Sequence, residues 1–146
     1  MYQSKKDNDM GKRILGVDFG DVRTGLALSD PSGFLASGAG TIKGGFETTA
    51  QAVAETAKKH DVCKIVLGHP INMDGSCGFR SEKIKDFAKR LDELTGIEVV
   101  LWDERLSTAN AHQILNLTNT RGEKRKSIID EMSACLILQG YLDAKR

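Results

Sequence analysis

Runs of apolar and polar positions divide this chain into strands and helices. Short continuous apolar runs, such as residues 63–67, are typical of strands that are buried on both faces. Apolar residues spaced three and four apart, as in residues 46–60, indicate helices with one buried face. The predicted strands are residues 14–17, 24–29, part of 34–42, 63–67 and 98–102, and the predicted helices are 46–60, 84–94, 107–117 and 127–143.

The order of these elements predicts an α/β fold with a mixed five-stranded sheet flanked by helices. Three strands come first, and strands then alternate with helices. Right-handed crossovers would place the first, fourth and fifth strands parallel and adjacent. Ligands of such sheets bind beyond the carboxyl ends of the strands. Asp18, the pair Gly68-His69 and the pair Asp103-Glu104 are therefore expected to share one edge.

Composition and length favour a single intracellular domain. The chain has 146 residues, and we expect one domain over residues 13–146 with a frayed or disordered segment at 1–12. A net charge of +1 argues against an extended basic surface, so an anionic partner must be met by a local patch. Three cysteines without a Cys-x-x-Cys pair, and the lack of a signal peptide or membrane span, predict a cytoplasmic protein.

Two carboxylates are unusual for their positions. Asp18 ends an apolar strand, where a charge is costly unless it is paired or bound to a metal, although it could instead cap the amides of the following turn. Asp130 begins the apolar stripe of the last predicted helix beside the small residues Ser133 and Ala134. The sequence Ser127-x-x-Asp130 is also a capping box, so a structural role for Asp130 is equally consistent with the pattern.

Acids gathered from separate segments at one sheet edge predict a metal site. Two carboxylates about 4 Å apart repel by roughly 4 kcal/mol at an effective dielectric near 20, so such a cluster takes up protons or binds a cation. Oxygen ligands favour Mg²⁺ or Mn²⁺ over zinc. Such ions support the hydrolysis of phosphodiester bonds.

Four ordered motifs carry a resemblance to a known family. They are Gly16-x-Asp18-x-Gly20-x-x-Arg23-x-Gly25, Gly68-x-Pro70 followed by Asn72-Met73-Asp74-Gly75-Ser76, Asp103-Glu104-Arg105-Leu106-Ser107-Thr108, and Asp130-x-x-Ser133-Ala134. Over residues 13–143 the chain resembles the YqgF family, also called RuvX, whose members are RNase H-like Holliday junction resolvases and pre-16S rRNA nucleases.

The resemblance implies an RNase H-like fold and a metal-dependent endonuclease that processes the 5′ end of pre-16S rRNA in ribosome biogenesis. The family's acidic residues, which serve as catalytic groups and metal ligands, fall on Asp18, Glu104 and Asp130. The chain departs from related sites at two points. The last motif has Ser133-Ala134 where two alanines are usual, and the fourth strand ends in Gly68-His69 without the carboxylate that RuvC-type resolvases carry there.

Basic residues near these motifs are candidates for nucleic-acid binding. A basic segment that leads into the helix carrying Asp130 lies where a phosphodiester backbone must pass, although a solvated connector is the simpler explanation of a short charge run. Arg23 and Arg105 could contact phosphates or form ion pairs, and His69 could act as a base or be structural. The candidate nucleic-acid contacts are Arg23, Arg105, Lys124, Arg125 and Lys126.

Three other functions remain open. A DNA resolvase would use the same site on four-way junctions, and a noncatalytic RNA-binding assembly factor would need no metal. A phosphate-binding domain of the actin and sugar-kinase type shares the first motif but requires two such domains. The expected partner is nucleic acid, as pre-rRNA or branched DNA, with no membrane association and with the chain a monomer or homodimer.

Overall fold

The computed structural model describes residues 12–70, 78–104 and 122–145, apart from the side chains of residues 123 and 124. The elements are β1 Arg13–Asp18, β2 Arg23–Ser29, β3 Ala36–Lys43, α2 Phe46–Lys59, β4 Val62–His69, α3 Phe79–Thr95, β5 Glu98–Asp103 and α5 Gly122–Ala144. The predicted helix at 107–117, Arg105 and residues 1–11 of the expected N-terminal tail lie outside the described residues.

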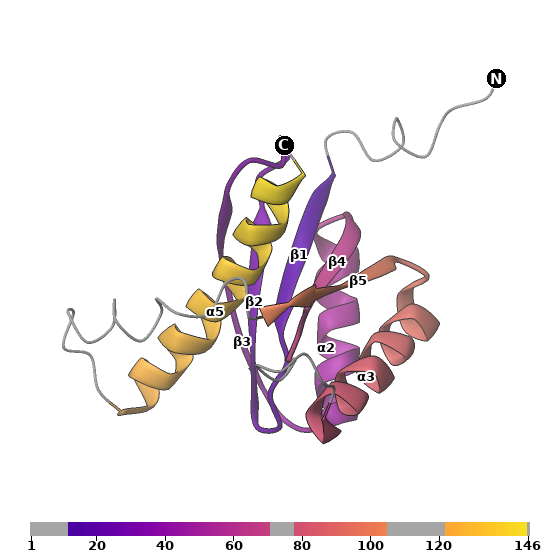
Figure 1. The fold of residues 1–146 in the computed structure, drawn as a ribbon, viewed down its shortest axis with the longest axis vertical. Coiled ribbons are helices and arrows are strands. Elements are labelled where there is room, and N and C mark those ends of the chain that lie inside the picture. The colour runs from indigo at the N-terminus through magenta and orange to yellow at the C-terminus, as the bar shows by residue number, and fades with distance from the viewer. Residues whose placement is uncertain (1–11, 71–77, 105–121, 146) are drawn as a thin grey trace.

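A mixed five-stranded sheet is the centre of the fold, as the sequence predicted. The strand order is β3-β2-β1-β4-β5, with β1, β4 and β5 parallel and with β2 and β3 antiparallel to their neighbours. Figure 1 shows α5 on one face of this sheet and α2 and α3 on the other. The carboxyl ends of β1, β4 and β5 therefore point to the same edge.

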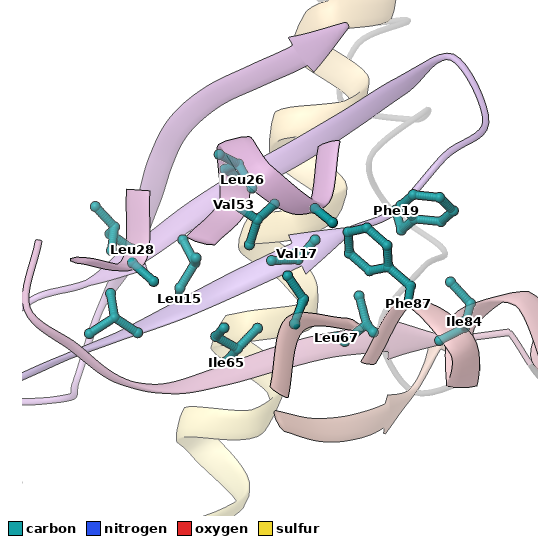
Figure 2. Packing of buried hydrophobic residues seen from close by; sticks show 14 residues of the cluster. Leu15, Val17, Phe19, Leu26, Leu28, Val53, Ile65, Leu67, Ile84 and Phe87 are labelled. Carbon is teal, nitrogen blue, oxygen red and sulfur yellow. The ribbon is translucent and has the colours of Figure 1, made fainter. Parts of the chain in front are cut away.

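Alternation along the strands divides the interior into two cores. Leu15 and Val17 of β1 face α2 and α3 and belong to the larger core. At its end near the tip of β1, the rings of Phe19 and Phe87 lie against each other (Figure 2). Their centroids are 4.2 Å apart. The second core lies under α5 and includes Val66 of β4.

Glycines on the α5 side bring the helix backbone onto the sheet. A Cβ atom built on Gly25 would lie 1.9 Å from the carbonyl oxygen of Asp130, and one on Gly16 would lie 2.7 Å from Leu138 Cβ. The structure shows that a packed helix occupies the space.

Helix α5 begins earlier than the sequence predicted. It starts at Gly122 instead of Ser127, so residues 122–126 of the predicted loop are helical. Glu, Lys and Arg are good helix formers, which explains the extension through this charged segment. The capping-box interpretation of Ser127 and Asp130 is wrong, because Ser127 lies inside the helix, where its Oγ is 3.0 Å from Thr41 Oγ1 of β3. Among the described residues, no helix is long and apolar enough to cross a membrane.

Candidate active site at the carboxyl ends of β1 and β5

Three acids meet on the α5 side of the sheet. Asp18 ends β1 on the same face as Gly16, which contacts Leu138 of α5. Glu104 follows the last residue of β5, and Trp102, on the same face, belongs to the core beneath α5. Asp130 comes from α5 itself. Segments far apart in the sequence therefore place these carboxyl groups together.

A glycine in β4 makes the space that the Glu104 carboxyl group occupies. A Cβ atom on Gly68 would lie 2.6 Å from Glu104 Oε1 and equally close to Ile137 Cδ1. The sequence showed only that the end of the fourth strand lacks a carboxylate. In the structure, the carboxyl group of Glu104 reaches over that position from the neighbouring strand.

Asp18 is the most perturbed member of this acidic cluster. Burial raises the pKa of Asp18 to about 8, and the nearby Glu104 carboxyl group adds to the effect by its charge and by a hydrogen bond. The charge of Asp130 raises this pKa further, whereas the Arg80 guanidinium acts in the opposite direction. Without a bound cation, Asp18 is therefore mostly protonated at neutral pH, and the two carboxyl groups share a hydrogen bond.

Arg23 orients the third acid. Its Nε donates a hydrogen bond of 2.9 Å to Asp130 Oδ2, and the two side chains are only 20% and 22% exposed. The sequence allowed Arg23 to bind a phosphate or to form an ion pair. The structure shows the ion pair, with Asp130 as its partner.

His69 points away from the acids. It is buried, and its Nε2 lies 2.5 Å from Ser81 Oγ of α3. Gly68 faces α5, so the next residue of the strand faces the opposite side of the sheet. This arrangement supports the structural interpretation of His69 rather than a role as a base.

Arg80 is a residue near the site that sequence reasoning missed. From the first turn of α3, its Nη2 donates a hydrogen bond of 3.1 Å to the carbonyl oxygen of Phe19, directly after Asp18. Its charge opposes the rise in the pKa of Asp18 that burial and the neighbouring acids cause. Neither a motif nor the helical spacing marks Arg80, because only the packing of α3 brings it to the end of β1.

A family profile described as "RuvX: Holliday junction resolvase" matches residues 12–144. The chain belongs to the RuvX family. Its relatives include a protein of Ruminiclostridium cellulolyticum named "Putative pre-16S rRNA nuclease", 44% identical over 133 residues, covering 90% of this chain and 94% of the relative. A protein of the same name from Bacillus thuringiensis is 46% identical over 136 residues, covering 91% and 99%. The predicted family is confirmed, and the predicted phosphodiester-hydrolysing endonuclease agrees with it.

The RNase H-like fold predicted for this RuvX-family chain is also confirmed. A structure of Thermus thermophilus RuvC in complex with Holliday junction substrate is similar with a TM-score of 0.61 at 10% identity, covering 92% of this chain and 96% of that one. A second structure of the same RuvC has a TM-score of 0.57 at 11% identity, covering 91% and 96%. At such low identity the likeness establishes the fold alone.

The acids of this RuvX-family site have the type of donor atom that a hard cation prefers. All their donor atoms are oxygens, which Mg²⁺ and Mn²⁺ prefer. As placed, however, no three His, Cys, Asp or Glu side chains among the described residues are arranged to hold one ion. Instead, Asp18 and Glu104 are hydrogen-bonded to each other, and Asp130 is bound by Arg23.

Proposed function

We propose that this chain is a metal-dependent endonuclease that cleaves structured nucleic acid, with precursor 16S rRNA as the substrate. The observation that carries the proposal is the meeting of Asp18, Glu104 and Asp130 on one face at the carboxyl edge of the sheet. A structural role does not account for Asp18, because its buried carboxyl group lies close enough to two further acids for their charges to raise its pKa. The names of the relatives support rRNA as the substrate.

Asp18 and Glu104 would hold Mg²⁺ or Mn²⁺ together, with Asp130 as the third ligand. Such an ion would neutralise charge on the phosphodiester and help water to act as a nucleophile. The residues of the chain fit this role because a cation can replace the proton that Asp18 carries at neutral pH. Arg23 orients Asp130 through Oδ2 and keeps its charge from adding fully to the repulsion in the cluster.

The three acids are tested by changing them one at a time. Asp18→Asn, Glu104→Gln and Asp130→Asn should each reduce cleavage of precursor rRNA by roughly a thousandfold, about 4 kcal/mol of barrier. Losses in double variants should not add, because the acids act as one unit. Glu55→Gln, an exposed acid on α2, is the matched control and should cleave like the parent. Parental cleavage by Asp130→Asn would show that Asp130 is not part of the active site.

The start of α5 is the proposed path of the substrate backbone. Lys124, Arg125 and Lys126 occupy the first turns of the helix that carries Asp130, and Lys126 is exposed. Phosphate contacts position a strand without reading its sequence. We also propose that Arg105, which follows Glu104 in the chain, contacts phosphate. Arg23 is bound to Asp130, so we propose that its first role is to orient that acid.

Salt dependence tests the contacts at the start of α5. If all three residues neutralise phosphates of single-stranded RNA, changing them to Gln should reduce the slope of log K against log salt by about 2, from roughly 0.7 per contact. Cleavage at saturating substrate should fall much less than in the acid variants. The charge-matched control changes Lys58 and Lys59 of α2, and Lys145 just beyond the C-terminal end of α5, to Gln. Equal slopes of log K against log salt in the parent and the α5 variant would show that this segment is a solvated helix end without phosphate contacts.

A Holliday junction resolvase is the second candidate, favoured by the description of the family. Purified protein should be given precursor rRNA, single-stranded RNA and a four-way DNA junction side by side, with Mg²⁺, Mn²⁺ or EDTA. We expect metal-dependent cleavage of the rRNA precursor. Cleavage of the junction alone would support the resolvase, and binding without cleavage would support the noncatalytic assembly factor. A cytoplasmic location and a monomeric or homodimeric state remain predictions.

A further inference from the structure

An arginine whose charge acts on Asp18 follows an exposed aromatic side chain at the start of α3. Phe79 is 89% exposed, the highest value among the exposed large apolar residues that the structure describes. The next residue, Arg80, donates its hydrogen bond to the carbonyl oxygen of Phe19, immediately after Asp18. Consecutive Cα atoms are ~3.8 Å apart, so both side chains start within the length of one nucleotide.

The exposure of Phe79 contrasts with the other rings near this end of the sheet. Phe19, Phe46 and Phe87 pack against one another in the larger core, with centroid separations of 4.2 to 6.0 Å. Phe79 begins α3 outside this group and gains little from burial. Exposed aromatic rings serve nucleic-acid binding proteins as platforms for unpaired bases, because every base has a face that can stack.

The charges around Phe79 favour a base at one position and a phosphate at another. A cavity of about 360 Å³ is lined by Phe46, Phe79, Glu82, Lys83 and Asp86. Two of these five residues are acids, which repel a phosphate but not an uncharged base. Lys83 forms an ion pair with Asp21, so its charge is partly balanced. The cavity therefore suits a base, and Arg80 is the cation that suits the phosphate attached to it.

We propose that Phe79 and Arg80 form a subsite for one unpaired nucleotide next to the bond that is cleaved. Phe79 stacks on the base, and the guanidinium of Arg80, whose planar fork matches a phosphate, binds the backbone beside Asp18. The inference rests on the proposed nuclease function. It adds whether the nucleic acid is single- or double-stranded at the cleaved bond. A base inside a duplex is stacked on its neighbours and cannot lie on Phe79, so the substrate is single-stranded there.

Binding measured without cleavage tests the stacking. In EDTA, the affinity of a fluorescent 12-nucleotide single-stranded RNA should fall about 5- to 150-fold in Phe79→Ala and recover in Phe79→Trp. Affinity for a duplex of the same sequence should not change. Phe34→Ala is the matched control, since Phe34 is 52% exposed and lies between β2 and β3 at the opposite end of the strands.

Removing bases from the ligand separates the two roles. An abasic RNA of the same length should bind the parent and Phe79→Ala equally, because there is no base to stack. Arg80→Gln should weaken both the complete and the abasic RNA, since both retain the phosphate. Arg13→Gln, at the start of β1 and far from its carboxyl end, should leave both affinities unchanged.

The outcomes distinguish failure of the subsite from failure of the proposed function. Equal affinities of the parent and Phe79→Ala for single-stranded RNA would overturn the subsite, even if the parent cleaves rRNA. A parent that cleaves nothing but binds RNA through Phe79 would overturn the nuclease and keep the subsite. Loss of affinity for the abasic RNA in Phe79→Ala would also overturn stacking, because that ligand has no base for the ring to contact. The melting temperature of Phe79→Ala should equal that of the parent, because the ring is exposed.

Discussion

At the scale of single residues, Gly68 determines where Glu104 can lie. The carboxyl group of Glu104 takes the space in which a side chain at position 68 would stand. The atoms that a methyl group would meet are the ends of two flexible side chains, Glu104 Oε1 and Ile137 Cδ1. Both can turn aside at modest cost, but the role that we propose for Glu104 depends on the position of its carboxylate.

Gly68→Ala should therefore damage activity more than stability. We expect cleavage to fall by roughly a hundredfold, the usual cost of displacing a catalytic group by about 1 Å. The loss of stability should stay near 1 to 3 kcal/mol, as for overpacking of a buried site. Gly45→Ala, where a methyl group meets nothing within 4 Å, is the control for both measurements. Full cleavage by Gly68→Ala would show that the position of Glu104 is not critical.

At the scale of elements, the close contact of α5 with β2 keeps Asp130 at the site. The carbonyl of Asp130 lies directly over Gly25, and Arg23 of the same strand binds the Asp130 carboxylate. The helix is also tied to β3, where Glu131 Oε2 accepts a hydrogen bond of 2.7 Å from the amide of Gly40. The position of the acid is thus set by backbone packing as well as by its ion pair.

Gly25→Ala should push α5 away from the sheet. The added methyl group would stand 1.9 Å from a backbone carbonyl oxygen, which cannot turn aside as a side chain can. We expect a loss of about 3 kcal/mol or more, or a failure to fold, measured by urea unfolding. The same Gly45→Ala variant serves as the control. A Gly25→Ala protein with parental stability would contradict the described contact between α5 and β2.

At the scale of the whole molecule, the acidic cluster makes the stability of the fold depend on pH. The pKa of Asp18 is about 8 in the folded state and near its ordinary value of 3.8 in the unfolded chain. Below about pH 4 the group is protonated in both states and has no effect on stability. Between these values only the unfolded chain releases the proton, so the free energy of unfolding falls as the pH rises.

Thermal melts of the parent and Asp18→Asn test this coupling. In EDTA the variant, which cannot ionise at this position, should gain stability relative to the parent as the pH is raised from 4 to 8. Added Mg²⁺ should stabilise the parent at pH 8 and leave the variant almost unchanged, because the ion binds the ionised carboxylate of the folded state. Equal shifts with Mg²⁺ in both proteins would place the ion elsewhere.

Much of the fold could be predicted from the sequence, because local patterns of apolar residues and residue types determine the strands and helices. The buried strand at Ile65 and the helix ended by Gly96 follow from spacing and from residue type, and right-handed crossovers then give the sheet order. The start of α5 was misplaced because Ser127 matches a capping box. Only the tertiary structure showed that this hydroxyl is paired with Thr41 of β3.

For the site, the three acids and the family motif could be recognised in the sequence, whereas tertiary packing decided their surroundings. The pairing of Arg23 with Asp130, the place of Glu104 over Gly68 and the approach of Arg80 to Asp18 all join segments distant in the chain. Local propensity and periodicity describe a residue's own element, whereas charge interactions and burial depend on distances in space. The pKa of Asp18 and the exposure of Phe79 could therefore be known only once the elements had been packed together.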